Sequence, residues 1–218
     1  MGNTDYGTLL SELPIFPLPG AVLFPGALLP LHVFEPRYVE MIGDVIAGDH
    51  FLAIANLDED HEADELGRPA VYPIATIGSV VSSQELPDNR FGVLLHGRDR
   101  IRIERELPPE KLYRKVVATV LDDTEAVESS APLIPQLVAL CDQLSMHFDE
   151  GGDQLRELVR ATDEPAALAD SIASALVNES VDRQKFLENL DPSSRLSELV
   201  GHVSGLLVAL KPRSEMPN

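Results

Sequence analysis

Cysteine and tryptophan are nearly missing from this chain. Among its 218 residues one is cysteine, Cys141, and none is tryptophan. A single thiol excludes an internal disulfide framework and a cluster of thiolate metal ligands, and it suits a reducing compartment. Cys141 falls on the apolar stripe of an expected helix, so we interpret it as a buried, unreactive thiol and not as a nucleophile.

The sequence also lacks a long apolar run. No segment approaches the ~20 apolar residues that a membrane-spanning helix needs. Residues 1–6 carry neither a basic stretch nor an apolar one, so no signal peptide is visible. We therefore expect a cytoplasmic protein with no membrane partner.

Positive charge is scarce. The chain has 17 Lys and Arg residues against 36 Asp and Glu residues, which gives a formal net charge of −19. Nucleic acids and anionic membranes are bound through Lys and Arg side chains, so this balance disfavours both kinds of partner. The one basic cluster is Arg98, Arg100, Arg102 and Arg105, and its alternation with isoleucines is typical of a solvated strand face. We expect no nucleic-acid partner and an acidic surface that keeps the protein soluble.

Motifs for catalysis and metal binding are missing as well. An ATPase needs a glycine-rich loop ending in Lys-Ser or Lys-Thr, and none of the four lysines stands in one. The six histidines do not occur at a metal-ligand spacing such as H-E-x-x-H. We therefore predict no catalytic residue, no metal site and no cofactor. A peptidase or small-molecule hydrolase with an unrecognised site remains the alternative.

What the chain does have is an apolar opening interrupted by prolines. Because proline lacks an N–H and fixes φ, residues 13–18 favour a short edge strand, followed by a turn at residues 19–20. Residues 28–34 favour a second strand, in which Leu29, Leu31 and Val33 share one face while His32, expected to be partly buried, and Phe34 take the other.

A helix from Pro36 to about Ala47 is predicted directly after this second strand. Pro36 suits the first helical position, where its missing N–H costs nothing. We expect Glu35 to cap this helix and Arg37 to pair with a carboxylate across the sheet.

The rest of the chain changes character from about Glu128. Short apolar runs predict strands at 51–56, 74–85, 91–95, 99–107 and 112–121, with a turn at 87–89, a break at 96–97 and an acidic loop at 57–69. A 3.6-residue period then predicts helices over 133–148, 153–160, 165–176 (capped by Thr162-Asp163), 181–190 and 191–210. The sequence thus indicates an α+β protein. Its predicted parts are a tail (1–12), a mostly β domain (13–121), a linker (122–132), a helical subdomain (133–211) and a second tail (212–218).

The opening run also carries a family resemblance. Pro17-Leu18-Pro19, Leu23-Phe24-Pro25-Gly26 and the run from Pro30 to Tyr38 are together similar to the start of the amino-terminal, substrate-binding domain of the Lon protease family. The similarity continues through residues 77–81, 85–91 and 96–103 and into the helices at 166–175 and 187–199. His96 stands where the family commonly has an acidic residue.

The resemblance implies a fold and a function. The fold is a PUA-like β-domain, a small barrel or folded sheet, followed by a helical bundle, in a stand-alone chain without the ATPase and protease modules. The function is non-catalytic binding of exposed apolar segments of unfolded or partly folded polypeptides, or service as an adaptor for a separate protease or chaperone. The oligomeric state stays open. The expected binding residues are Phe24, Leu29, Leu31, Phe34, Glu35, Arg37 and Tyr38.

Overall fold

The computed structural model describes residues 6–125 and 131–210, which divide into two compact units. The first unit takes the described residues of Met1–Asp122 together with Glu179–Glu188, and the second takes those of Asp123–Asn178 and Asn189–Asn218. The predicted helical segment 133–211 is therefore divided, because residues 179–188 make their contacts in the first unit. Residues 1–5 and 212–218 of the expected tails, and 126–130 of the expected linker, lie outside the described residues.

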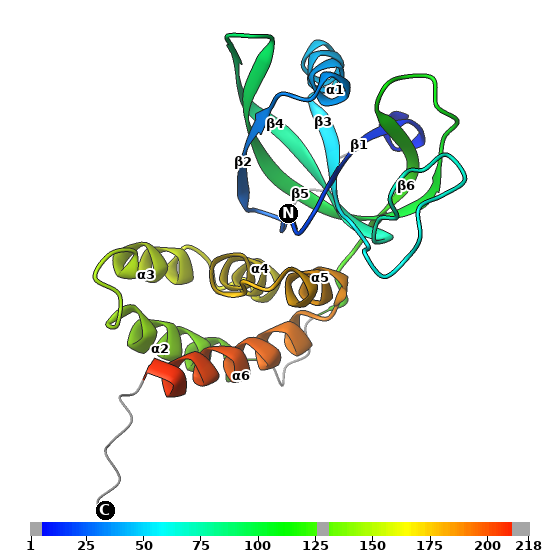
Figure 1. The fold of residues 1–218 in the computed structure, drawn as a ribbon. Helices are drawn as coiled ribbons and strands as arrows, with labels where there is room; N and C mark the ends of the chain where they lie inside the picture. Colours follow the sequence, from blue (N-terminus) through cyan, green and yellow to red (C-terminus); the bar gives the residue numbers. More distant parts are fainter. Residues whose placement is uncertain (1–5, 126–130, 211–218) are drawn as a thin grey trace, which may run out of the picture. The chain divides into compact units, whose positions relative to one another are not determined.

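The first unit is built mainly from strands (Figure 1). Its described elements are the short 3-10 helix η1 (Leu9–Ser11), β1 (Leu13–Leu18), β2 (Leu28–Val33), α1 (Pro36–Ala47), β3 (Phe51–Asn56), β4 (Ile74–Leu86), β5 (Arg90–Glu106), β6 (Arg114–Leu121) and α5 (Ser180–Glu188). The strands form one sheet in the order β2-β5-β4-β3-β1-β6, and β5 pairs with β6 in addition. Strands β5, β4, β3, β1 and β6 thus pair in a closed circuit, in which the last strand pairs with the first. Strand β2 lies outside this circuit and pairs with β5.

The prolines of β1 fit inside the sheet because each neighbouring strand covers only half of it. β6 pairs with Leu13–Ile15, and β3 pairs in parallel with Ile15–Leu18. Pro14 therefore has a partner only in β6, and Pro17 only in β3. The prediction of β1 as an edge strand was wrong. A proline prevents backbone pairing only at its own position, so a second strand can still pair with the other residues of the same strand.

β5 runs through the predicted break at residues 96–97 as one strand of 17 residues. Gly97 explains both the break in the sequence pattern and the continuity of the strand. A Cβ at this position would lie 2.1 Å from the Phe24 carbonyl oxygen, so only glycine permits this close approach. The Gly97 N–H donates to the Ala27 carbonyl at 2.9 Å, and its carbonyl accepts from the Gly26 N–H at 2.9 Å.

Alternation along the strands divides the apolar interior of the first unit into two clusters. In β3, Leu52 and Ile54 join the cluster under α1, while Ala53 and Ala55 join the other cluster. Both faces of β3 are thus covered, which explains why its sequence is continuously apolar and does not alternate. The α1 cluster consists of Phe16, Leu23, Val33, Tyr38, Val39, Met41, Ile42, Val45, Leu52, Ile54, Val93, Leu95 and Tyr113.

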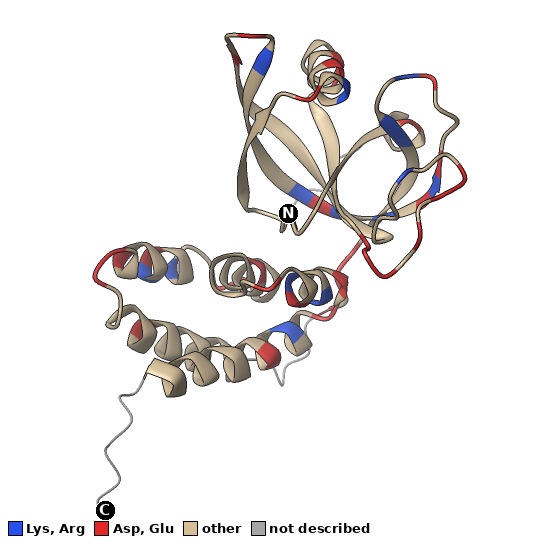
Figure 2. Ribbon diagram, in the orientation of Figure 1, with Lys and Arg blue, Asp and Glu red and all other residues tan. Residues whose placement is uncertain are grey.

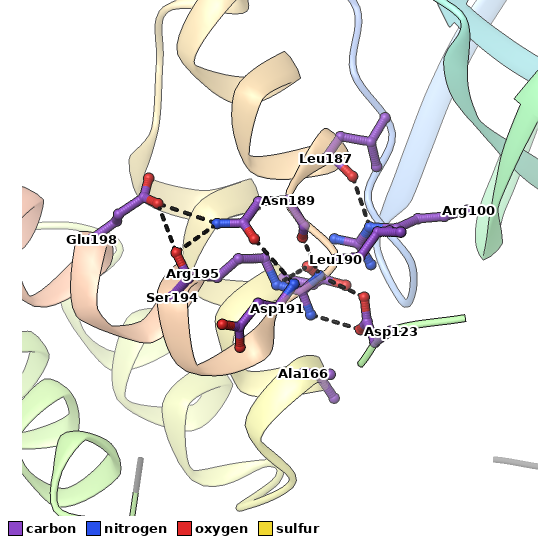
Figure 3. Close-up of polar contacts among 12 residues, drawn as sticks. Arg100, Asp123, Ala166, Leu187, Asn189, Leu190, Asp191, Ser194, Arg195 and Glu198 are labelled. Carbon is purple, nitrogen blue, oxygen red and sulfur yellow. Dashed lines mark hydrogen bonds and ion pairs between the residues drawn. The ribbon is translucent and has the colours of Figure 1, made fainter. Parts of the chain in front are cut away.

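Helix α5 is held to the first unit by side chains that bind backbone carbonyls. The Arg183 guanidinium donates to the Val22 carbonyl at 2.9 Å, and the Gln184 amide donates to the Ile74 carbonyl at 3.0 Å. From the sheet, the buried Arg100 donates to the carbonyl of Leu187 at 2.9 Å (Figure 3). The Ile74 and Leu187 carbonyls lie at the end of a strand and of a helix, and the Val22 carbonyl lies in the loop before β2, so all three are acceptors that regular backbone pairing leaves available.

The second unit is helical. Its described helices are α2 (Leu133–Ser145), α3 (Gly152–Arg160), α4 (Pro165–Leu176) and α6 (Pro192–Leu210). Apolar residues at the predicted helical spacing form the buried centre of each stripe, and Cys141 is fully buried within that of α2, but Phe148 and Leu210 at the ends of the predicted stripes are exposed. The expected cap of α4 was wrong: Glu164 is the capping residue, and its carboxylate accepts from the N–H groups of Ala166 and Ala167.

A fully buried arginine in α6 joins two distant parts of the second unit (Figure 3). The Arg195 guanidinium donates to both carboxylate oxygens of Asp123, at 2.8 and 2.7 Å, and to the Asn189 carbonyl at 2.9 Å. The buried Asp170 carboxylate lies 3.7 Å from its Nε. The chain enters the second unit at Asp123 and again at Asn189, so Arg195 holds both of these entry points.

Replacing Arg195 by alanine should destabilise the second unit strongly. The change removes the cation between two carboxylates, and breaking a buried pair from one side costs about 3–5 kcal/mol. Urea denaturation followed by circular dichroism measures this loss. Arg160→Ala is the matched control, because Arg160 pairs with Asp142 at 3.2 Å on the surface and should cost about 0–1 kcal/mol. Equal losses for the two variants would contradict the interpretation.

Gly97→Ala should destabilise the first unit by about 1–3 kcal/mol or more, because the added methyl group must displace the Phe24 backbone. Gly43→Ala serves as the control in the same unit. Gly43 lies exposed within α1 and has no atom within 4 Å of an added Cβ, so alanine should stabilise by up to about 1 kcal/mol. Opposite signs in one denaturant series are the expected result, and a neutral Gly97→Ala would refute the steric argument.

Candidate functional site

Strand β2 stands at the end of the sheet and pairs only with β5. In the register of this antiparallel pair, Leu29 lies opposite Leu95 and Leu31 opposite Val93. The other edge of β2 has no partner strand among the described residues. A free edge of this kind is where an extended peptide can add to a sheet.

Pro30 lies in the middle of this free edge, and its ring faces outward from the ladder. The bond from the Gly97 N–H to Ala27 marks that pair as hydrogen-bonded, and such pairs alternate along an antiparallel ladder. Pro30, three residues further on, is therefore in a non-hydrogen-bonded pair, and the N–H that proline lacks is one that would face the free edge. β2 thus offers backbone groups at Leu28 and His32 with a gap between them.

The side chains of β2 divide into two faces, as the sequence predicts. Val33 is buried, and Leu29 and Leu31 are half-buried against the α1 cluster. Leu28, Pro30 and His32 are exposed on the opposite face. The alternation is confirmed, but the expectation that His32 is partly buried was wrong.

The outer face of β2, which we define as Leu28, Pro30, His32 and Phe34, exposes large apolar side chains. Leu28 is 59% exposed and Phe34 is 65% exposed. The rings of His32 and Phe34 meet edge to face with centroids 6.4 Å apart. Beside them on β5, His96 lies opposite Leu28, and burial lowers the pKa of its imidazole, with the Arg98 charge adding to the effect. The outer face therefore contains large apolar side chains and no Asp, Glu, Lys or Arg.

The corner between β2 and α1 is fixed by local contacts. Glu35 occupies the capping position of α1, but its carboxylate makes no side-chain cap, contrary to expectation. It pairs instead with Arg37 at 2.8 Å, and the Arg37 guanidinium lies 4.5 Å from the centre of the Tyr38 ring. Arg37 thus pairs next to itself in sequence and not across the sheet. Burial raises the pKa of the Tyr38 hydroxyl.

The expected binding residues are separated by the fold. Phe24 is fully buried and Tyr38 is 7% exposed, so both belong to the interior. Leu29 and Leu31 are half-buried, Glu35 and Arg37 form the ion pair at the corner, and Phe34 reaches the surface. The structure adds Leu28, which the sequence reasoning left out. Its parity with His32 and Phe34 was the available signal.

The basic cluster on β5 is not a uniform solvated face. Arg98, Arg102 and Arg105 are exposed, but Arg100 is 3% exposed and binds the Leu187 carbonyl. The prediction failed there because alternation shows which residues share a face, not whether another element covers it. α5, which comes more than 70 residues later, provides that cover.

Within residues 6–125 and 131–210, no three His, Cys, Asp or Glu side chains are placed to hold a metal ion. Burial raises the pKa of the Cys141 thiol to about 12, which disfavours the reactive thiolate. No helix in the described part of the chain is both long and apolar enough to cross a membrane.

The family model for the ATP-dependent protease La (LON) substrate-binding domain matches residues 12–205. The chain belongs to this family. The resemblance seen in the opening run is thereby confirmed, and the match extends over both units.

Relatives and solved structures agree with this assignment. "Lon protease" of Desulfosudis oleivorans is 24% identical over 210 residues, 96% of this chain and 26% of the relative. "Lon protease" of Solibacter usitatus is 29% identical over 195 residues, 86% of this chain and 23% of the relative. The chain thus spans about a quarter of the length of these curated relatives.

Two solved structures share the fold. The N-terminal domain of Mycobacterium avium complex Lon protease has a TM-score of 0.73 at 18% identity, covering 89% of this chain and 98% of that one. The Lon N-terminal domain protein from Xanthomonas campestris has a TM-score of 0.62 at 22% identity, covering 93% and 99%. The predicted α+β class is confirmed.

Pro30→Thr should increase self-association of the protein. Threonine restores a donor in the centre of the free edge, and continuous edges pair with one another. Sedimentation velocity over a concentration series measures the effect. The control is Pro108→Thr, which changes an exposed proline outside any strand and should leave the sedimentation coefficient unchanged. A Pro30→Thr protein that sediments like wild type would contradict the role assigned to this proline.

Proposed function

We propose that this chain is a non-catalytic module that binds exposed apolar segments of unfolded or partly folded polypeptides at the outer face of β2. The observation that carries the proposal is the pair of large apolar side chains, Leu28 at 59% and Phe34 at 65% exposure, at the two ends of one edge strand. Membership of a substrate-binding family supports a role in binding substrate.

The contacts favour side-chain recognition over a long backbone ladder. An extended segment laid along β2 meets Leu28 and Phe34 at the ends of the strand and the Pro30 ring between them. The gap at Pro30 removes the central backbone donor, so apolar burial supplies most of the affinity, at about 25 cal/mol per Å² of apolar surface. Such binding is non-directional and tolerates many sequences, which suits a module that meets diverse unfolded chains.

The remaining parts of the proposal follow from the same features. The closed circuit of five strands supports a PUA-like classification of the first unit. The acidic charge and the single cysteine suit a cytoplasmic protein that acts beside a separate protease or chaperone, as an adaptor or as its substrate-binding part. Leu29, Leu31 and Tyr38 pack in the α1 cluster beneath the site, Phe24 is fully buried, and the Glu35–Arg37 pair holds the corner at its end.

Binding is tested with an acidic model protein in its native form and in a reduced, carboxymethylated, unfolded form. Because this protein has a net charge of −19, an acidic model protein is not drawn to it by opposite net charge, and any binding must have another cause. We expect binding of the unfolded form only, measured by isothermal titration calorimetry. Equal and negligible binding of both forms would refute the proposal, and sustained cleavage of the unfolded form by the purified chain would refute its non-catalytic part.

The assignment to β2 is tested with the variant Phe34→Ser. The control is Leu112→Ser, which removes an apolar side chain of the same unit that is equally exposed, at 66%. Phe34→Ser should weaken binding by about tenfold or more, as for an apolar anchor at an interface. Leu112→Ser should have no effect. Equal losses would place binding on general surface hydrophobicity and contradict the assignment to β2.

A further inference from the structure

The second unit contains an apolar groove that the proposed function does not use. Its volume is 280 Å³, and it lies between the α2–α3 loop, α3 and the end of α4. The lining residues are Phe148, Glu150, Gly151, Gln154, Leu155, Leu158, Ala175 and Leu176, all within the second unit. Phe148 at its mouth is 42% exposed, and the neighbouring Met146 is 78% exposed.

Two glycines explain why this groove stays open. α2 ends at Ser145, and a Cβ on Gly152 would lie 2.4 Å from the Ser145 carbonyl oxygen, so α3 begins directly against the end of α2. Gly151 has φ of +87°, a left-handed conformation that other residues rarely adopt. The loop of residues 146–150 spans this tight turn, and Phe148 on it stays 42% exposed.

The rim of the groove is acidic. Asp149 and Glu150 lie on the loop, and Glu157 follows Gln154 by three residues, on the neighbouring part of the α3 surface. Figure 2 shows the α2–α3 loop in red beside α3. Among the described residues, no cation forms an ion pair with Asp149, Glu150 or Glu157.

The basic residues of α3 do not neutralise this rim. The Arg156 guanidinium donates to the Ser145 hydroxyl at 2.7 Å and pairs with Asp153. Arg160 pairs with Asp142 of α2 at 3.2 Å. By helical spacing both arginines lie away from Gln154 and Leu158, on the side of α3 toward α2. The groove is therefore apolar inside and negative at the edge.

We propose that this groove is a second docking site, which takes the apolar face of a basic amphipathic helix from a partner protein. The apolar face of such a helix fits against Phe148, Leu155 and Leu158, and its Lys or Arg residues meet the carboxylates of Glu150 and Glu157. This is the helix-in-groove mode of recognition. Charge complementarity gives the site a selectivity that the outer face of β2 lacks, since the latter has no Asp, Glu, Lys or Arg.

The probe is a synthetic 18-residue amphipathic helix of Leu and Lys that carries a single Trp on its apolar face. Because the protein has no Trp, the emission of the peptide reports its own burial without background. We expect a blue shift that saturates, and a dissociation constant that rises steeply with salt. A matched peptide with Glu in place of every Lys should not bind. Failure of the Lys peptide to bind, or equal binding of both peptides, would overturn the proposal.

Protein variants separate this site from general attraction to an acidic chain. Phe148→Ser should weaken binding about tenfold. Val208→Ser, which removes an apolar side chain of α6 that is 68% exposed, should leave it unchanged. Equal losses from these two variants would overturn the assignment to the groove.

Charge reversal completes the test. The double variant Glu150→Lys with Glu157→Lys should weaken binding of the Lys peptide by about tenfold, because two attractive contacts between glutamates and peptide lysines become repulsive. The control, Asp60→Lys with Glu62→Lys, makes the same change of net charge on the exposed β3–β4 loop of the first unit and should have little effect. Equal losses in the two double variants would mean that net charge alone accounts for the binding, and would overturn the proposal. If Phe34→Ser abolished binding of the Lys peptide, the peptide would bind at β2 and the groove proposal would be overturned. The assay with the unfolded protein tests the β2 site independently.

Discussion

The contact between Phe24 and Gly97 is the constraint on which the first unit depends. β5 pairs with β2, β4 and β6, so every other strand is positioned directly or indirectly by its course. The Phe24 carbonyl occupies the space that a side chain at position 97 would need. The segment before β2 thus crosses β5 at backbone contact distance, which buries Phe24 and delivers the chain to the open end of the sheet. The Thr76 hydroxyl holds the preceding Leu23 carbonyl at 2.5 Å and secures the same crossing.

Placing β2 outside the closed circuit of strands creates both an opportunity and a risk. An edge strand with exposed Leu28 and Phe34 can receive an extended chain, but it can also receive another copy of itself. Pro30 removes one donor at the centre of that edge, and the net charge of −19 opposes close approach of two copies. Under the proposed function, the same apolar face would bind unfolded polypeptides through its side chains, while the incomplete backbone edge and the net charge would oppose pairing between two copies.

The first unit contains one segment, Glu179–Glu188, from the later part of the sequence. α5 comes from the carboxyl-terminal half of the sequence but is bound to the first unit through Arg183, Gln184 and the buried Arg100. On the other side of Glu188, Arg195 holds Asn189 and Asp123 in the second unit. Two buried arginines thus secure the chain on either side of one passage. Their hydrogen bonds satisfy carbonyls that would otherwise be costly to bury.

The sequence by itself determined the family, the α+β class and the elements whose signals are local. β1, α1 and β3 begin and end at the predicted residues, because prolines, glycines and apolar periodicity act within a few residues of chain. Alternation also gave the two faces of β2. Only the tertiary structure decided which faces are covered, since covering depends on elements far away in sequence. It buried Phe24 and Tyr38, exposed Phe34 and Leu28, placed β1 inside the sheet, and brought α5 over Arg100. Of the residues predicted for the site, the sequence located the strand and the corner, and packing decided which of their side chains are exposed.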